Sequence, residues 1–469
     1  MTHTFFKFAI LWAICLVPAA GYGEPPALIV EAEEDVYRYE PANNGAGPMW
    51  SAGSTCLVRI GAHVFASGLE TLAQHQPLNN CRWQLFQGGA DGWKLLHADP
   101  QGRTREPCPI VGFPDGRLFL SANPTLTAPD KHNGPARPEV LQFDALRPRE
   151  PYHTLVPPWD GEPPFNEHSY RSFAADGSQG EWILLQNIEY AHAEWSFRDA
   201  SERWAAQGRL IWPWGAEYEK PQPIRLCYPN VMLRDRAIYF CGVSDIIEPN
   251  PAWRKYKKEL TGRDWDYDFR RLFFTWSEDI TTGKFHDWIE IASREATGGW
   301  IFPCDLWAAA DGGVHLLWTE RAIDTRLREK FFPEAKQSQA LNYALVRDGG
   351  IVIRRSLILA EEGGASLTAG AARFHLTPDL RLWVICYVSG ADADGRSVAE
   401  NRLFEMLPDG TAGAPVRVPF DRPFTSFFTA TVRGGSAPSD ILDLLGVRAG
   451  GGNAISYARI RLRPAATAR

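Results

Sequence analysis

The sequence has 469 residues, of which 45% are hydrophobic and 12% aromatic, and it carries a net charge of -7 at neutral pH. This composition is typical of a well-packed globular protein and excludes a disordered chain, and the length exceeds that of one simple core unless the fold is built from repeats. The mild acidity excludes a surface that coats a polyanion, so nucleic acid is not an expected partner, although a local basic pocket for an acidic substrate remains compatible with it.

The first 23 residues have the pattern of a secretory signal. Lys7 supplies the positive charge, residues 8–17 form an apolar stretch, and residues 18–21 supply small side chains for cleavage. The apolar stretch is too short to span a membrane comfortably. We therefore expect a protein of residues 24–469 that is secreted or periplasmic and not inserted in a membrane.

Seven cysteines remain after this signal, and none of them forms a CxxC pair. An odd number without such spacing argues against a disulfide framework and against a zinc site. Cys227 and Cys241 could face each other in one hairpin. For most of the seven, a buried free thiol in a strand is the expected state.

Short alternating apolar runs separated by Gly, Pro and Asp-Gly turns indicate an all-β protein. A hairpin recurs along the chain, each time followed by outer strands, at residues 54–70, 107–123, 169–186, 228–244, 302–320, 371–389 and 426–448. The last unit has one following strand, residues 454–461, and lacks a partner that residues 27–31 can supply. This pattern predicts a single seven-bladed β-propeller of four-stranded blades, closed by the N-terminal strand, over residues 24–469. Closure hides the strand edges that an open stack would expose.

Residues 166–195 are the most informative stretch. Strands at residues 169–175 and 181–186 are joined by a turn at 176–180, and polar residues occupy only the outer ends: Asn166, Glu167, His168, Asn187, Glu189, Tyr190 and His192. A hairpin places these ends beside each other, so the side chains should converge on one edge of the sheet. The turn between the two inner strands should be short in every blade. The long loops, residues 71–80, 124–137, 245–270, 321–339 and 390–400, should then emerge on the same face and build the site.

At these residues the chain resembles the BNR/sialidase-like propellers of carbohydrate-active enzymes, above all the propeller polysaccharide lyases and glycosidases. Locally the resemblance rests on His168-Ser169-Tyr170, on Ala175-Asp176-Gly177 and on the second polar end at residues 187–192. A single segment like an Asp box, residues 277–283, has altered spacing, and no three-arginine cluster can be assigned. The resemblance therefore implies a carbohydrate-active propeller rather than a true sialidase.

This resemblance implies cleavage of glycosidic bonds in an acidic polysaccharide that could contain uronate. A lyase must neutralise the carboxylate, remove the C5 proton and protonate the departing oxygen, and His and Tyr suit the last two tasks. His168 and His192 are the candidates for base or neutraliser, and Tyr170 and Tyr190 for acid. Arg171 or Asn187 could hold the carboxylate, but if Tyr170 faces the channel, strand alternation turns Arg171 into the blade.

Other rim residues are expected to bind substrate: Glu70, Glu189, Tyr228, Asn230, Asp305, Glu320 and Arg321. A glycosidase that uses paired carboxylates, sialidase-like or otherwise, would draw them from Glu70, Glu189, Glu320 and Asp305, although each of these could simply tie blades together. A glycan-binding propeller without catalysis is a further alternative. No cofactor is expected: His168, His192 and Glu189 could form a metal site, but their spacing does not require a divalent cation. The expected partner is a polysaccharide or oligosaccharide, bound by a monomer.

Overall fold

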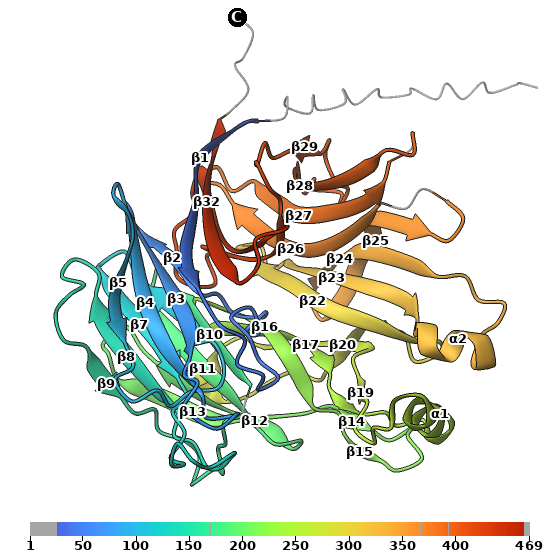
Figure 1. Cartoon of the computed structure of the whole chain (residues 1–469), viewed down its shortest axis with the longest axis horizontal. Helices are drawn as coiled ribbons and strands as arrows, with labels where there is room; N and C mark the ends of the chain where they lie inside the picture. Colours follow the sequence, from blue (N-terminus) through green and yellow to red (C-terminus); the bar gives the residue numbers. More distant parts are fainter. Residues whose placement is uncertain (1–25, 169, 365–366, 393, 464–469) are drawn as a thin grey trace, which may run out of the picture.

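The computed structural model describes residues 26–168, 170–364, 367–392 and 394–463. The predicted signal lies outside these residues. Seven antiparallel four-stranded sheets follow one another along the described chain, from β2–β5 to the sheet that contains β1 and β32 (Figure 1). The predicted seven-bladed β-propeller is confirmed.

Each blade is numbered in chain order, with its strands given from the axis outward. Blade 1 contains β2 (Leu57–Ile60), β3 (His63–Thr71), β4 (Cys81–Gly89) and β5 (Gly92–Ala98); blade 2 contains β6 (Ile110–Gly112), β7 (Arg117–Ala122), β8 (Glu139–Asp144) and β9 (His153–Leu155). Blade 3 contains β10 (Arg171–Asp176), β11 (Glu181–Ile188), β12 (His192–Arg198) and β13 (Trp204–Ile211); blade 4 contains β16 (Leu226–Arg234), β17 (Ala237–Ser244), β20 (Arg271–Ser277) and β21 (Ile289–Ser293). Blade 5 contains β22 (Gly298–Ala308), β23 (Val314–Ile323), β24 (Ser338–Arg347) and β25 (Gly350–Glu361); blade 6 contains β26 (Thr368–Leu376), β27 (Leu382–Ala391), β28 (Ser397–Glu405) and β29 (Val416–Arg417).

Blade 7 is assembled from both ends of the chain. Its strands are β30 (Phe424–Thr429), β31 (Ile441–Arg448), β32 (Ala454–Arg463) and, outermost, β1 (Ala27–Arg38). The register of β1 against β32 runs from Ala27 opposite Arg463 to Arg38 opposite Ala454, and the two strands lie side by side in Figure 1. Closure by the N-terminal strand is therefore confirmed, with a strand longer than the five residues predicted.

Burial along the strands follows from their position in a blade. Every residue of β11 is buried because a second strand is covered on both faces by neighbouring blades, whereas the outermost strand β13 alternates between more and less exposed residues. The turn between β10 and β11 closes on Asp176, whose Oδ1 accepts hydrogen bonds from the backbone N–H groups of Ser178 and Gln179. Local turn chemistry and alternation thus specify the hairpin.

Two helices interrupt the long loops, which the sequence pattern did not predict. Helix α1 (Pro251–Thr261) starts at the N-cap Asn250 and ends at Gly262, which has a φ of 71°. Helix α2 (Thr325–Phe331) packs against α1, and the two lie together at the outer edge of blades 4 and 5 (Figure 1). The remaining short elements are η1 (Ile280–Thr282) and the strand pairs β14 (Trp214–Gly215) with β15 (Gln222–Pro223) and β18 (Ile246–Ile247) with β19 (Tyr267–Asp268). Within the described ranges, no helix has the length and apolarity needed to cross a bilayer.

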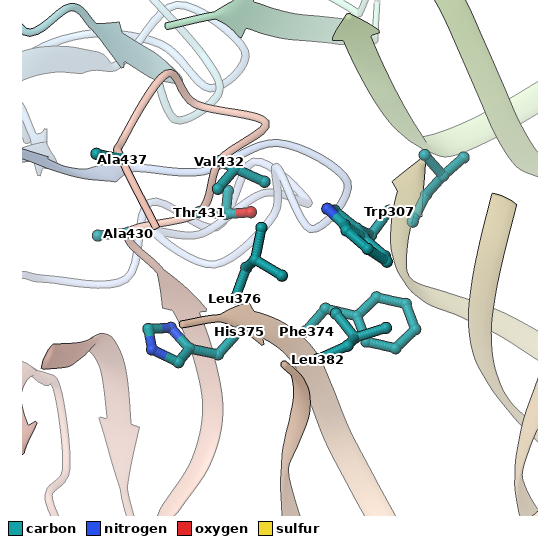
Figure 2. A pocket seen from close by; sticks show the side chains of 10 residues that line it. Trp307, Phe374, His375, Leu376, Leu382, Ala430, Thr431, Val432 and Ala437 are labelled. Atoms are coloured by element: carbon teal, nitrogen blue, oxygen red, sulfur yellow. The ribbon is translucent and has the colours of Figure 1, made fainter. Parts of the chain in front are cut away.

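One prediction about the loops was wrong. The connection between the two inner strands of blade 7, residues 430–440, is not a short turn but a long loop that reaches across the axis, and we call it the plug loop. The backbone N–H of Ala175 in blade 3 donates to Arg433 O over 2.8 Å, and the N–H of Gly112 in blade 2 donates to Gly434 O over 2.9 Å. Figure 2 shows part of this loop over Phe374, His375 and Leu376 of β26. A loop of this length has no signature in strand periodicity.

A second segment, residues 42–56 between β1 and β2, crosses the opposite face, and we call it the entry segment. Gly53 lies so close to blade 4 that a Cβ there would stand 2.1 Å from Pro229 O, so no other residue fits. Arg433 of the plug loop donates to Gly53 O over 3.0 Å. The two segments meet at the axis and close it.

The seven cysteines in the described part of the chain are free and buried. Cys227 and Cys241 lie in one hairpin, but their register partners are Val243 and Asn230, so they do not face each other.

Candidate functional site

The inner strands all run in the same direction, so their N-terminal ends gather on one face of the ring, which we call the entry face. His168 precedes β10, Tyr228 is the third residue of β16, and Glu320 pairs with Ile301 near the start of β22. These residues therefore lie at the same end of the propeller. The short turns and the plug loop occupy the other end.

His168 is held by two residues that directly precede the inner strand of blade 2. The Nη1 of Arg105 lies 2.6 Å from His168 Nδ1 and donates to Glu106 Oε1 over 3.0 Å. Glu106 Oε1 is itself 4.0 Å from His168 Nδ1. Arg105 is fixed by two further hydrogen bonds to Asn44 O in the entry segment.

This contact defines the state of the imidazole. A guanidinium can only donate, so Nδ1 of His168 accepts and the ring proton must lie on Nε2. Withdrawal from water, together with the cations Arg105 and Arg225, lowers the pKa of His168 to about 4. The side chain is nevertheless 48% exposed. His168 is thus a neutral imidazole that presents an N–H donor to the entry face.

A line of partly exposed rings connects His168 to blade 5. The centroid separations are 6.4 Å from His168 to Tyr170, 5.6 Å from Tyr170 to Tyr228, 5.2 Å from Tyr228 to Phe302 and 5.5 Å from Phe302 to Trp300. We call these five residues the aromatic strip. Sugar rings stack on aromatic faces of this kind, so the strip is a surface on which an extended saccharide can lie.

Tyr228 is held in a strained conformation. Its φ is 48°, in the left-handed region, and the register of β16 against β17 shifts between Cys227 and Asn230. Bulges and left-handed non-glycine residues next to each other re-aim a side chain and are common at functional sites. Here they turn the phenol of Tyr228 into the middle of the aromatic strip.

Arg225 lies at the centre of a cluster of phenols beside the strip. Its guanidinium is 4.0 Å from the ring centroid of Tyr190 and 5.7 Å from those of Tyr170 and Tyr267, and it forms an ion pair of 2.6 Å with Asp245. The hydroxyls of Tyr190 and Tyr267 are 2.9 Å apart. Burial raises the pKa of Tyr190 to about 12 and also raises the pKa of Tyr170. Tyr170 and Tyr190 therefore stay protonated at neutral pH and add to the donors around His168.

The far end of the strip opens into a cavity of about 410 Å³ between blades 5, 6 and 7. Trp300 and Phe302 form one wall, and Arg321, Glu320 and Arg373 contribute charged groups. Glu320 is paired with Arg294. A smaller cavity of about 270 Å³, beside α1 and α2, shares Trp300 and Arg321 with it.

Several predicted site residues are engaged elsewhere. His192 lies in β12, the third strand of blade 3, with its Nε2 2.8 Å from Glu194 Oε1. Glu70 accepts a hydrogen bond of 2.7 Å from Arg82 in β4. Asn187 donates to Leu226 O and ties blade 3 to blade 4. Among the contacts of the described residues, none joins His192 or Glu70 directly to His168.

Of the remaining candidates, some lie at the entry face and others are buried between blades. Arg171 is buried and donates to Pro107 O over 2.6 Å, so it points into the blade while Tyr170 joins the strip. Asn230 and Asp305 are buried and both accept from Arg433 of the plug loop. Glu189 is exposed after β11, with a φ of 44°. A structural role is thus observed for Arg171, Asn230 and Asp305.

Within the described residues, no three or more His, Cys, Asp or Glu side chains are grouped so that they could hold an ion. His168, His192 and Glu189 do not form such a group.

Sequence reasoning missed Arg105, Glu106, Arg225, Trp300 and Arg373. Arg105 and Glu106 stand shortly before β6, Arg225 directly before β16, and Trp300 near the start of β22. Arg105, Glu106 and Arg225 precede the inner strands of their blades, as His168 precedes that of blade 3. Comparing the residues before every inner strand would have identified these three, whereas Trp300 lies inside β22. Arg373 lies inside β26 and carries no such signal.

No family model matches this sequence, and no curated protein matches it significantly. Among solved structures, an ulvan lyase from a new family of polysaccharide lyase, PL25, aligns with a TM-score of 0.53 and 8% identity, over 91% of this chain and 95% of that chain. A protein of unknown function from Dyadobacter fermentans aligns with a TM-score of 0.45 and 11% identity, over 93% and 100% of the two chains. The α-L-arabinanase of Penicillium chrysogenum aligns with a TM-score of 0.40 and 10% identity, over 92% and 98%. The first of these likenesses confirms the predicted resemblance at the level of the propeller fold.

Proposed function

We propose that this protein is a secreted carbohydrate-active enzyme that cleaves glycosidic bonds in an acidic polysaccharide by elimination at a uronate. The observation that carries the proposal is the geometry of His168, a neutral imidazole with its Nε2–H exposed at one end of an aromatic strip. Fold alone does not carry it, since one fold hosts many activities.

In such an elimination the C5 proton leaves, the bond from C4 to the glycosidic oxygen breaks, a C4=C5 double bond forms, and the departing oxygen takes up a proton. Negative charge develops on the uronate carboxylate before the bond breaks. A neutral imidazole that donates through Nε2 stabilises such charge without first giving up its proton. His168 supplies this donor, and the N–H of Arg105 on Nδ1 fixes the tautomer that provides it.

Tyr170 is the candidate for proton transfer, because it is the phenol next to His168 in the strip and lies beside the Arg225 cation. Its raised pKa keeps the hydroxyl protonated; in one concerted step it donates this proton to the departing oxygen while the phenol oxygen accepts the C5 proton, so that Tyr170 ends in its starting state. Tyr190, hydrogen-bonded to Tyr267, belongs to the same phenol cluster.

A glycosidase with two carboxylates has less support. Of the four carboxylates expected for it, Glu70, Asp305 and Glu320 are each paired with an arginine. Among the described residues only Glu189 of this set has no arginine partner, and the nearby Glu106 and Asp245 are also paired and almost fully buried. The aromatic strip would also serve a protein that binds a glycan without cleaving it, so this alternative stays among the outcomes of the test.

The experiment is a screen of the purified protein on uronate polysaccharides that follows the absorbance of the unsaturated product. We expect product from the native protein and a decrease of about a hundred-fold or more in turnover for His168→Ala. His286→Ala is the matched control, since His286 is an exposed histidine that pairs with Glu278 on the outer part of blade 4. Full activity of His168→Ala would remove its catalytic role. New reducing ends without absorbance would indicate a hydrolase, and binding without cleavage would indicate a glycan-binding protein.

A further inference from the structure

We propose that the 410 Å³ cavity between blades 5, 6 and 7 is a binding subsite for a carboxylate-bearing sugar, in which Arg373 at the base and Arg321 at the rim bind the carboxylate. The inference deepens the proposed function, because it assigns recognition of the acidic group of the chain to a place apart from His168. It rests on geometry and charge balance in the cavity.

Around Arg373, at the base of the cavity, the buried side chains carry more positive than negative charge. Arg373 and Arg433 are 6% and 4% exposed, and the one carboxylate beside them is that of Asp305, 2% exposed. Asp305 forms an ion pair with Arg433, whose Nη2 lies 2.6 Å from Asp305 Oδ1. The other oxygen of Asp305 accepts from the backbone N–H of Phe374. Two buried guanidiniums thus lie beside a single carboxylate, and an anionic ligand would balance the charge of Arg373.

Arg373 has donors left for that ligand. Its Nη1 donates to Cys304 O over 2.7 Å and to Ala372 O over 2.9 Å, and its Nη2 donates to Ala52 O over 3.0 Å. A guanidinium has five N–H groups. The two others find no partner in the described part of the chain. Burial lowers the pKa of Arg373, which is the cost that a bound anion would relieve.

The rim supplies a second cation and a stacking surface. The Arg321 guanidinium lies 5.9 Å from the ring centroid of Trp300, and no carboxylate among the described residues pairs with it. Trp300 stacks on Phe302 at an interplanar angle of 14°, so the two rings present one flat wall. The cavity's own carboxylate, Glu320, is neutralised by Arg294. A sugar whose apolar face packs against Trp300 would place its carboxylate between Arg321 and Arg373. The positive charge of these two side chains favours an acidic sugar over a neutral one.

The cavity also has the right position and size. Its volume lies within the range of ordinary small-ligand sites. It opens at the Trp300 end of the aromatic strip, whose other end is His168. A saccharide lying along the strip would therefore place one acidic residue in the cavity and another part of the chain at His168.

The test compares the binding of sodium glucuronate and of glucose to the purified full protein by calorimetry or ligand-observed NMR. We expect glucuronate to bind more tightly than glucose, with affinity that falls as salt is added. Arg321→Gln should weaken glucuronate binding by roughly ten- to hundred-fold, the loss typical of one charge-assisted hydrogen bond. Arg373→Gln should weaken it at least as much, and its thermal unfolding must be checked because Arg373 also holds three backbone carbonyls.

Arg328→Gln is the control, since Arg328 lies on α2, pairs with Glu362 and does not line the cavity. This variant should bind glucuronate like the native protein. The proposal is overturned if glucose binds as tightly as glucuronate, or if Arg321→Gln, an exposed position that tolerates the change, leaves the affinity unaltered.

His168→Ala separates this inference from the proposed function. The variant should lose turnover on the polysaccharide and keep its affinity for glucuronate. If no polysaccharide is cleaved but glucuronate binding still depends on Arg321, the proposed elimination fails and the acidic subsite stands.

Discussion

At the scale of single residues, withdrawal from water and the cation of Arg105 set the state of His168. Arg105 is 3% exposed and is held by Glu106 and Asn44, so its guanidinium cannot turn away from the imidazole. Protonating Nδ1 would bring two donors face to face. The native imidazole therefore stays neutral far below the pH at which a free histidine takes up its proton.

The sign of the pH effect follows from this shift. The pKa of His168 in the native protein is about 4, below its ordinary value of 6.5. As the pH falls from 6.5 towards 4, the unfolded chain binds the proton and the native protein does not. His168 therefore destabilises the native state progressively over that interval.

Arg105→Met tests the cause of the shift. The variant removes the donor on Nδ1 and one nearby cation, so we expect the pKa of His168 to rise towards 6.5. NMR titration of the imidazole resonances measures it directly. A pKa that stays near 4 in the variant would show that withdrawal from water alone sets the value.

At the scale of elements, the plug loop and the entry segment connect different blades across the axis. They meet at the axis through Arg433, which reaches Gly53 O in the entry segment, Val231 O in blade 4 and Asp305 in blade 5. The loop thereby fixes the positions of inner strands that carry the entry face.

Arg433→Met should destabilise the protein by about 3–5 kcal/mol, because it leaves the Asp305 carboxylate buried without its partner. Denaturant unfolding with matched slopes measures the change. Adding Asp305→Leu should recover much of the loss, since two apolar side chains need no counter-charge. A double variant that is less stable than Arg433→Met would mean that Asp305 acts chiefly through its hydrogen bond to Phe374.

At the scale of the whole molecule, the ring depends on β1. This strand covers the edge of β32 and adds ion pairs from Arg448 to Asp35 and Glu33. Without it, blade 7 would end in an open edge, which favours pairing with other chains.

Removing residues 26–38 should therefore lower the thermal unfolding midpoint and produce aggregates on size-exclusion chromatography. A synthetic peptide of residues 26–40, added in excess, should restore part of the midpoint by occupying the edge of β32. A truncated protein that remains monomeric with an unchanged midpoint would show that three strands are enough for blade 7.

The sequence by itself determined the elements of this protein that depend on local pattern. Alternating apolar runs separated by Gly, Pro and Asp-Gly turns recur along the chain, so the strands, their order and the closing strand followed from periodicity. The direction of the inner strands then predicted that Glu70, His168, His192, Tyr228 and Glu320 lie at one end. These properties are repeated along the chain and need no knowledge of distant contacts.

Only the tertiary structure decided which of those side chains meet. Arg105 reaches His168 across 63 positions of sequence, and Arg433 reaches Asp305 across 128. His192 follows His168 closely in the chain but lies in the third strand of its blade, bonded to Glu194. Periodicity reports on one strand at a time, whereas partners of buried charges are chosen among blades that close packing brings together. For that reason the sequence could predict the end of the propeller at which the site lies, whereas the partners of its charged side chains could be found only in the structure.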